Sequence, residues 1–305
     1  MDKLTAIKTF IKVAETGKFS AAADVMGIPP PRATQRVRDL ENYLRVRLLD
    51  RTTKSLALTP EGAEYLDACR RIVRELEEVE DTLHGQTIGA TGNLRIEAIS
   101  SIGRRVIAPR LKEFQADNPA IQIAMGCSDR VALLAGAGID CFLRGGVLDD
   151  SSYIAKPLCS IHFGLYAAPD QASVIQRPID LEQAKRIGIY VSHPESASAW
   201  VLQSGESVVR VEVAGGLLFD DTEAAVAAAA NGCGIVAAPV FLAAPLVFSG
   251  QLSPVLPHWS AGIKPLNALY PSTRHTPRRL RKFLEWVEGV LHQHPHLTAE
   301  PIEIA

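Results

Sequence analysis

The chain has 305 residues, of which 47% are hydrophobic and 22% charged, and its formal net charge is −2. This length exceeds that of most single hydrophobic cores, so we expect two or three domains, and the composition excludes an intrinsically disordered chain. The five cysteines form no CxxC pair, which argues against a zinc site or a disulfide framework. No apolar run approaches ~20 residues and the N-terminus lacks a long apolar stretch, so we expect a cytoplasmic protein without a membrane segment.

Charge is distributed unevenly along the chain. Residues 1–60 contain 11 Lys/Arg and 6 Asp/Glu, whereas residues 61–82 contain 3 Lys/Arg and 8 Asp/Glu. A basic N-terminal block in a mildly acidic protein indicates that one part of the molecule binds a polyanion.

Three helices are predicted in the first 45 residues. The first ends at Gly17, and the second covers about 19–26, with Ser20 as its N-cap and Gly27 just past its end. The third follows three prolines at 29–31, which are accepted in the first turn of a helix although they supply no capping side chain. The apolar positions at helical spacing are Leu4, Ile7, Phe10, Ile11 and Val13 in the first helix and Ala33, Val37, Leu40 and Leu44 in the third.

Residues 19–44 therefore have the organisation of a helix-turn-helix unit. In this motif the N-terminal part of the second helix contacts base edges in the major groove, where Arg binds guanine and Gln binds adenine. Residues 48–58 predict the two short strands of a wing that contacts phosphates. The predicted DNA-contacting residues are Ser20, Pro30, Pro31, Arg32, Thr34, Gln35, Arg36, Arg38, Arg51, Thr52 and Lys54. The spacing alone is also compatible with the alternative of an ordinary three-helix domain whose charged face is solvated.

The same residues resemble the N-terminal signature of the LysR-type transcriptional regulators. The matching motifs are Phe19-Ser20-Ala21-Ala22, Leu40-Glu41, Leu48-Leu49-Asp50-Arg51 and Leu58-Thr59-Pro60-Glu61-Gly62. The resemblance implies a winged helix-turn-helix DNA-binding domain over residues 1–58. The chain departs from the family at Pro29, where serine is usual, and at Pro30, where a polar residue such as Gln is usual. The base preference at that position is therefore not carried over.

A long helix is predicted within residues 59–86, with Thr59 as its cap and Pro60 in its first turn. Its apolar positions alternate by three and four residues, as in a coiled coil. These positions are Leu66, Cys69, Ile72 or Val73, Leu76, Val79 and Leu83. We interpret it as a dimerising linker helix, which the resemblance also implies; a helix packed into a core is the alternative.

Residues 87–305 alternate predicted strands and helices, which indicates an α/β architecture with mainly parallel sheets. The helices include 103–119, 130–138 and 181–187, and the strands include a single one over 208–219. The resemblance implies an effector-binding domain with a two-lobed, periplasmic-binding-protein-like fold. Lobe I would comprise about 92–162 and 266–292, and lobe II about 163–265.

Ligands of parallel sheets bind beyond the carboxyl ends of the strands. Ser100 and Ser101 follow the first such strand, where hydroxyls and free backbone amides suit a carboxylate or similar anion, and the family commonly uses these positions. The predicted effector-binding residues are Ser100, Ser101, Arg144, His193, Asp221, Thr222 and Pro239. Helix capping is the alternative role for Asp221 and Thr222, and a solvated surface position for Arg144 and His193.

The sequence thus predicts a transcriptional regulator without a cofactor or metal. Its expected partners are double-stranded DNA with a pseudo-palindromic operator, a small carboxylate or aromatic effector, and RNA polymerase. The chain is also expected to pair with copies of itself as a homodimer or homotetramer. A solute-binding receptor whose N-terminal domain serves only dimerisation, or an enzyme using the cleft, are the alternatives; no nucleophile or acid–base motif supports the enzyme. His292, His294 and His296 favour a frayed terminal segment over a metal site, and Cys233 is the cysteine to consider for redox sensing.

Overall fold

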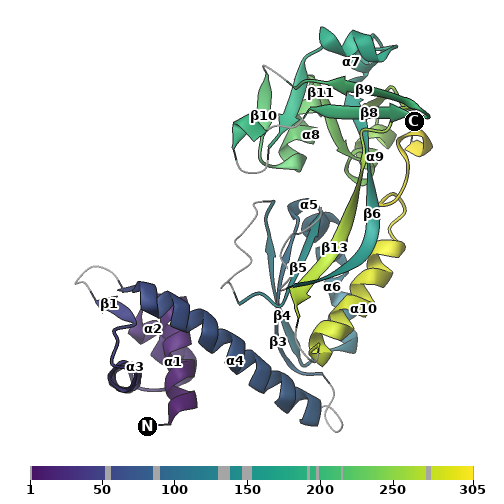
Figure 1. Cartoon of the computed structure of the whole chain (residues 1–305). Helices are drawn as coiled ribbons and strands as arrows, with labels where there is room; N and C mark the ends of the chain where they lie inside the picture. Colours follow the sequence, from purple (N-terminus) through teal and green to yellow (C-terminus); the bar gives the residue numbers. More distant parts are fainter. Residues whose placement is uncertain are drawn as a thin grey trace. The chain divides into compact units, whose positions relative to one another are not determined.

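The computed structural model describes residues 2–51, 56–84, 90–129, 138–145, 153–190, 193–196, 199–213, 216–272 and 276–304. The chain divides into two compact units (Figure 1). The first includes residues 1–89, and the second includes residues 90–132 and 139–305. Among the described residues, no helix is both long and apolar enough to cross a membrane.

The first unit is a three-helix domain with a small wing and a long final helix. Its elements are α1 (Lys3–Thr16), α2 (Phe19–Met26), α3 (Pro30–Leu44), β1 (Leu49–Arg51), β2 (Leu56–Leu58) and α4 (Pro60–His84). Strands β1 and β2 pair antiparallel, as the wing prediction requires. Gly17 and Gly27 end α1 and α2 in the left-handed conformation that glycine adopts without strain. Ser20 is not the N-cap of α2, because the helix already begins at Phe19 and Lys18 occupies the cap position.

The first turn of α4 contains a glycine, Gly62, for a steric reason. The Thr59 hydroxyl accepts a hydrogen bond from the Gly62 amide at 2.9 Å, so Thr59 caps the helix as predicted. A Cβ at Gly62 would lie 1.9 Å from the Leu48 carbonyl oxygen. Glycine at this position lets α4 pass directly over the residues that lead into the wing.

The apolar positions of α4 do not all form one seam. Leu66, Cys69 and Val73 are buried in the core of the first unit with Phe10, so the first half of α4 is a core-packed helix. Ile72 and Val79, seven residues apart, are instead 56% and 52% exposed. The predicted seam is therefore wrong at Leu66, Cys69 and Val73, whereas the exposed Ile72 and Val79 remain available to another chain and Leu76 is half-buried. The side chain of Leu83 lies outside the described residues.

The second unit contains a twisted sheet that joins two lobes. Within the described residues it has nine strands, in the order β10-β7-β11-β6-β13-β5-β3-β4, with β12 paired to β6. The long strands β6 (Tyr153–Ala167) and β13 (Ile263–Pro271) pair antiparallel with each other and run through both lobes. They replace the mainly parallel arrangement expected from sequence at the centre of the sheet.

Lobe I is built on three parallel strands covered by helices. Its elements are β3 (Gly92–Ala98), α5 (Ser100–Ile102), the π-helical turn η1 (Gly103–Ile107), the 3₁₀ turn η2 (Ala108–Arg110), α6 (Leu111–Asp117), β4 (Ile121–Cys127), β5 (Cys141–Gly145) and α10 (Arg278–His292). Strand β3 pairs parallel with both β4 and β5. The core packs Leu94 and Ile96 of β3 against Phe283 and Val287 of α10.

Lobe II repeats this plan and adds a hairpin. Its elements are α7 (Pro169–Ala172), η3 (Pro178–Glu182), β7 (Arg186–Ile189), η4 (Pro194–Ser196), β8 (Trp200–Ser204), β9 (Ser207–Val211), β10 (Leu217–Phe219), α8 (Thr222–Ala230), β11 (Ile235–Pro239), α9 (Val240–Phe248), β12 (Ser253–Val255) and η5 (Pro301–Ile304). Strand β7 pairs parallel with β10 and β11, while β8 and β9 form a separate antiparallel hairpin.

Two sequence predictions in the second unit are wrong, and a third needs refinement. The segment predicted as a helix over 103–119 is helical from Gly103 to Asp117, but as a succession of π, 3₁₀ and α turns, with Pro109 in the 3₁₀ turn. The helix predicted over 181–187 is instead the end of a 3₁₀ turn followed by β7. The single strand predicted over 208–219 is two strands in different sheets. The helix predicted over 130–138 lies almost wholly outside the described residues.

Candidate DNA-contacting surface and effector region

The three prolines form the start of α3. Pro29 is the N-cap residue and provides no side-chain hydrogen bond, while Pro30 and Pro31 occupy the first two helical positions. The Arg32 amide donates to the Pro29 carbonyl at 2.9 Å, so the helix is hydrogen-bonded from the first residue that has an N–H. Proline therefore begins this helix without breaking it, as predicted.

One face of α3 is buried and the opposite face is exposed. Ala33, Val37 and Leu40 are fully buried, as the apolar spacing predicted. On the other side the structure exposes Ser20 of α2 and the α3 residues Pro30, Pro31, Arg32, Gln35 and Arg38. Thr34 and Arg36 are half-buried. Most of the α3 residues that are predicted to contact the DNA major groove are thus solvent-accessible.

Two of the predicted base-reading side chains are engaged within α3. The Thr34 hydroxyl donates to the Pro30 carbonyl at 3.2 Å. The Gln35 amide nitrogen donates to an Asp39 carboxylate oxygen at 2.8 Å. This bond uses one of the two N–H groups of the Gln35 amide, and it restrains how Gln35 can be presented to an adenine.

The remaining predicted contacts are Arg51, Thr52 and Lys54. Arg51 ends β1, and Thr52 and Lys54 lie outside the described residues. Glu41 of α3 holds the beginning of the wing, because one carboxylate oxygen accepts from the Leu48 and Leu49 amides at 3.0 and 3.2 Å. The Leu40-Glu41 pair therefore links the helix core to the wing.

The predicted effector residues of lobe I gather at the carboxyl ends of β3, β4 and β5. Ser100 and Ser101 are 4% and 5% exposed at the start of α5. The Ser100 amide is not free, since it donates to an Asp129 carboxylate oxygen at 2.7 Å. An anion bound here would have to use the hydroxyls or a side-chain cation rather than this amide.

Arg144 supplies such a cation. Its Nη1 donates to the Ser128 carbonyl at 2.5 Å, and its Nη2 lies 4.0 Å from a Glu97 carboxylate oxygen. Nη2 is buried and makes no hydrogen bond among the described residues. Burial lowers the pKa of the Arg144 guanidinium, and the charges of Glu97 and Asp129 oppose that shift. Arg144 is therefore a half-buried, ion-paired residue, and the alternative of a solvated surface position is wrong.

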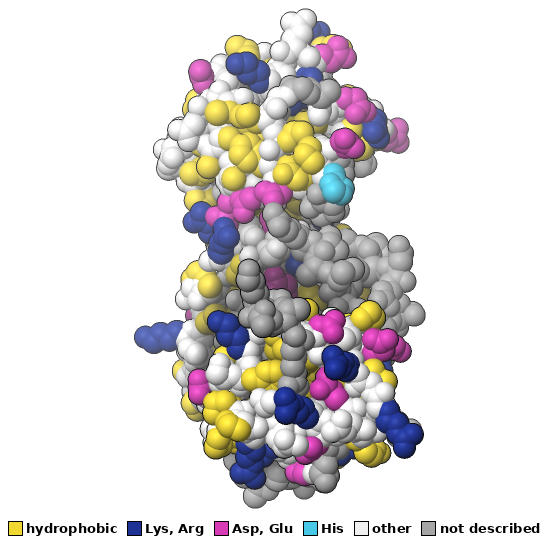
Figure 2. Space-filling view, turned by 90° about the vertical axis from the view of Figure 1, so that its left-hand side faces the viewer, with side chains coloured by type: hydrophobic (Ala, Val, Ile, Leu, Met, Phe, Trp, Pro, Cys, Tyr) yellow, Lys and Arg dark blue, Asp and Glu magenta, His cyan; other side chains and the backbone are white. Residues whose placement is uncertain are grey.

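The predicted effector residues of lobe II occupy the carboxyl ends of its parallel strands. Asp221 follows β10 and caps α8, accepting from the Ala224 amide at 2.8 Å, while Thr222 is the first helical residue. Pro239 ends β11 and is buried, and exposed His193 follows β7. Figure 2 shows a row of acidic side chains along the edge of lobe II, with Lys or Arg side chains beside one end of it.

Two ion pairs that the sequence did not predict connect the lobes at this edge. Arg105 of η1 donates from Nε and Nη2 to one Glu223 carboxylate oxygen at 3.0 and 2.9 Å. Arg104 lies 3.9 Å from Asp221. We refer to Arg104, Arg105, Asp221 and Glu223 as the inter-lobe clasp. The adjacent arginines after Ser100-Ser101 were visible in the sequence, but their partners are more than a hundred residues away.

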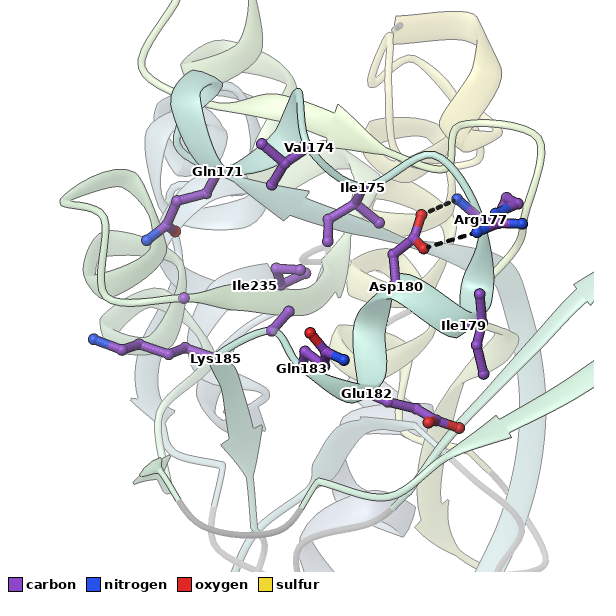
Figure 3. Close-up of a pocket in the computed structure, with 12 residues that line it drawn as sticks. Gln171, Val174, Ile175, Arg177, Ile179, Asp180, Glu182, Gln183, Lys185 and Ile235 are labelled. Carbon is purple, nitrogen blue, oxygen red and sulfur yellow. Dashed lines mark hydrogen bonds and ion pairs between the residues drawn. The ribbon is translucent and has the colours of Figure 1, made fainter.

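A separate depression lies at the opposite end of the lobe II strands. It has a volume of about 720 Å³ and is lined by residues such as Ile175, Lys185 and Ile235 (Figure 3). Lys185 precedes β7 and Gly234 precedes β11, so this depression is at the amino ends of those strands. None of the seven predicted effector residues lines it.

The histidine and cysteine candidates are dispersed. His294 packs edge-on against Phe241, and His296 packs against Phe248 with the two rings tilted. Cys233 is exposed, whereas Cys69 and Cys141 are buried. No cluster of His, Cys, Asp or Glu side chains suited to a metal ion occurs in the described part of the chain.

Comparisons with known proteins match both units. Residues 4–63 match the family described as bacterial regulatory helix-turn-helix protein, lysR family, and residues 88–291 match the LysR substrate binding domain. An HTH-type transcriptional repressor of Pseudomonas aeruginosa is 42% identical, covering 100% of this chain and 97% of its own.

Solved structures extend the likeness to the fold. The LysR-type regulator CrgA of Neisseria meningitidis is 28% identical with a TM-score of 0.58, covering 95% of this chain and 98% of its own. The virulence activator AphB of Vibrio cholerae is 25% identical with a TM-score of 0.60, and the match covers 95% of this chain and 99% of the AphB chain.

Proposed function

The chain belongs to the LysR family of DNA-binding transcriptional regulators, and on that premise we propose how it reads DNA and where its effector binds. Its relatives are transcriptional regulators and not enzymes, and they do not support a solute receptor with an N-terminal dimerisation domain. We place its action in the cytoplasm, on a pseudo-palindromic operator, with RNA polymerase as the complex it regulates.

The outward face of α3 supports the DNA-reading proposal. Arg32 and Gln35 are exposed beside the proline-capped start of the helix, where helix-turn-helix proteins contact base edges. Pro30 and Pro31 offer only apolar surface, which suits a thymine methyl group. Sequence selectivity at the helix start then comes from shape and methyl contact, and hydrogen-bonded selectivity from Arg32 and Gln35.

Pairing of chains is assigned to Ile72 and Val79 of α4. These residues recur at a seven-residue interval, and neither belongs to the apolar core that the described residues of the first unit form. A second α4 would cover both residues and bring two DNA-binding units onto two half-sites. Further pairing through the second units would give a tetramer.

The effector is proposed to be a small carboxylate bound where the lobes meet. The observation that carries this is the convergence of parallel-strand carboxyl ends from both lobes, held together by the Arg105–Glu223 pair. The half-buried Arg144 guanidinium favours a carboxylate over an uncharged aromatic compound. Because α5 runs directly into the π-helical turn that carries Arg104 and Arg105, a ligand touching Ser100 or Ser101 also bears on the clasp. Such a ligand changes DNA binding only through different affinities for two lobe arrangements.

A gel-shift titration on the DNA upstream of the chain's own reading frame tests the DNA-reading proposal. Gln35→Ala and Arg32→Ala should each weaken binding to that DNA by about tenfold or more, because a lost bidentate base contact costs about 1–3 kcal/mol. Binding to random-sequence DNA should change much less. If upstream and random DNA bind equally well to the parent chain, this assignment of the operator is wrong.

A further inference from the structure

We propose that Arg38, Arg45 and Arg47 form a seat for a phosphate of the DNA backbone at the C-terminal end of α3. We refer to these three residues as the distal arginine seat. The proposal rests on the DNA-binding function above, but it concerns the end of the helix opposite to the base-reading residues.

The first observation is backbone strain at Arg45. This residue is the C-cap of α3 and has φ +57° and ψ 30°, the left-handed conformation. Its amide donates to the Glu41 carbonyl, which a glycine would do equally well without strain. A cation near a helix C-terminus is favourable, but that gain is smaller than the cost of left-handed geometry for a residue with a Cβ. The stability of the fold therefore favours glycine at position 45, so we infer that the arginine side chain is present for a function other than folding.

The second observation is that the three guanidinium groups have no partner of their own. Within the described residues, none of Arg38, Arg45 and Arg47 makes a side-chain hydrogen bond or ion pair, and all three are exposed. They line a depression of about 590 Å³ together with Asn42. The Glu41 carboxylate also lines this depression. It accepts hydrogen bonds from the Leu48 and Leu49 amides and so fixes the turn on which Arg45 and Arg47 lie.

The third observation is the position of the seat on the helix. Gln35, Arg38, Asn42 and Arg45 follow one another at intervals of three and four residues, so they lie on one stripe of α3. This stripe is opposite to the buried face of Ala33 and Val37. The seat therefore continues the face that carries the proposed base-reading residues.

The length of the stripe indicates what the seat contacts. From residue 31 to residue 45 the helix rises by about 21 Å, whereas the major groove is about 12 Å wide. When the N-terminal turns of α3 contact base edges, its far end extends past the groove to the flanking sugar–phosphate ridge. Guanidinium groups match phosphate oxygens in charge and in hydrogen-bond geometry, so a backbone phosphate fits this site.

The salt dependence of DNA binding tests the seat. We would titrate the full-length chain and its Arg45→Gly, Arg47→Gln and Arg38→Gln variants with a random-sequence duplex over a range of salt concentrations. Each lost phosphate contact should reduce the slope of log K against log salt by about 0.9 for every first unit that is bound to DNA. Arg45→Gly is the most informative variant, because it relieves strain and should fold at least as well as the parent. Lys112→Gln, an exposed lysine of lobe I, is the charge-matched control and should leave the slope unchanged.

Each outcome decides the proposal. A reduced slope on random DNA, with equal loss of affinity on upstream DNA, supports a phosphate seat. Unchanged slopes in all three variants overturn it, and so does a loss restricted to upstream DNA, which would indicate base reading. If Gln35→Ala and Arg32→Ala leave specificity intact while Arg45→Gly reduces the slope, the base-reading proposal fails and the seat stands.

Discussion

Four arginines of the first unit that we propose to contact DNA are unpaired, whereas three arginines around the proposed effector region of the second unit are paired. Arg32, Arg38, Arg45 and Arg47 have no ion pair among the described residues. In the second unit, Arg104, Arg105 and Arg144 each lie within 4.0 Å of a carboxylate oxygen. The two regions therefore use the same side chain in different ways.

This difference follows from what each region must do. A surface that meets a polyanion gains most if its cations are solvated and unpaired beforehand, because no internal bond has to be broken. A region that changes state on ligand binding needs internal bonds that can be exchanged for bonds to the ligand. The predictions below test whether the paired arginines behave as exchangeable bonds and the unpaired ones as open sites.

The largest effect is expected at Arg144. Arg144→Ala should weaken binding of a carboxylate effector about 50-fold, because a hydrogen bond to a charged group contributes about 1.5–3 kcal/mol. The measurement is a thermal-shift screen of the full chain with benzoate, salicylate and succinate, followed by calorimetry on any carboxylate that stabilises the parent.

Arg144→Ala also removes the cation beside Glu97, so it should lower stability by itself. Adding Glu97→Gln removes the uncompensated carboxylate and should recover part of that stability without restoring effector binding. Recovery of both properties would show that Arg144 serves only the fold.

A smaller effect is expected at the inter-lobe clasp. Arg105→Glu places two carboxylates where an ion pair stood, and because Arg105 is 64% exposed the pair contributes no more than about 1 kcal/mol. Hydrogen exchange of residues 100–107 and 221–230 should become about fivefold faster. The double reversal Arg105→Glu with Glu223→Arg should restore the parent rate.

The control for the clasp is a pair within one lobe. Arg110 and Glu113 form an ion pair at 2.7 Å on the surface of lobe I. Arg110→Glu should leave exchange at residues 221–230 unchanged. Equal acceleration in both variants would mean that the clasp does not couple the lobes.

Much of the first unit could be predicted because its determinants are local. Apolar spacing placed Val37 and Leu40 in the core, and the prolines and glycines marked where helices begin and end. The seam of α4 was wrong at Leu66, Cys69 and Val73 because periodicity shows that a face is apolar but not what covers it. Leu66 satisfies a coiled-coil pattern and a core pattern equally well.

The second unit was predicted less well because its determinants are distant in sequence. Strand β6 contains Pro157 and has no regular alternation, so its sequence gives no periodic strand signal. The β8–β9 hairpin had one local signal that was missed, the turn residue Gly205, which has φ +57°. The strand before it has no clear alternation in sequence, because Val201 between buried Trp200 and Leu202 is apolar but exposed. The clasp had none, since the partners of Arg104 and Arg105 become neighbours only after both lobes fold.

The smallest effect is expected at Asp39, the internal partner of Gln35. Asp39→Ala removes an i,i+4 hydrogen bond worth about 0.2–0.5 kcal/mol, so the Gln35 amide is no longer restrained when it turns toward a base. Affinity for upstream DNA should rise about twofold in a fluorescence-anisotropy titration. The matched control is Asp67→Ala, which removes an exposed carboxylate of α4 in the same unit. In the Gln35→Ala background, Asp39→Ala should give only the gain that the control gives, because there is no amide left to release. An undiminished gain in that background would mean that Asp39 lowers DNA affinity through its negative charge alone, and not through its hydrogen bond to Gln35. The first unit would then repel DNA even at a carboxylate that is hydrogen-bonded to a neighbouring side chain.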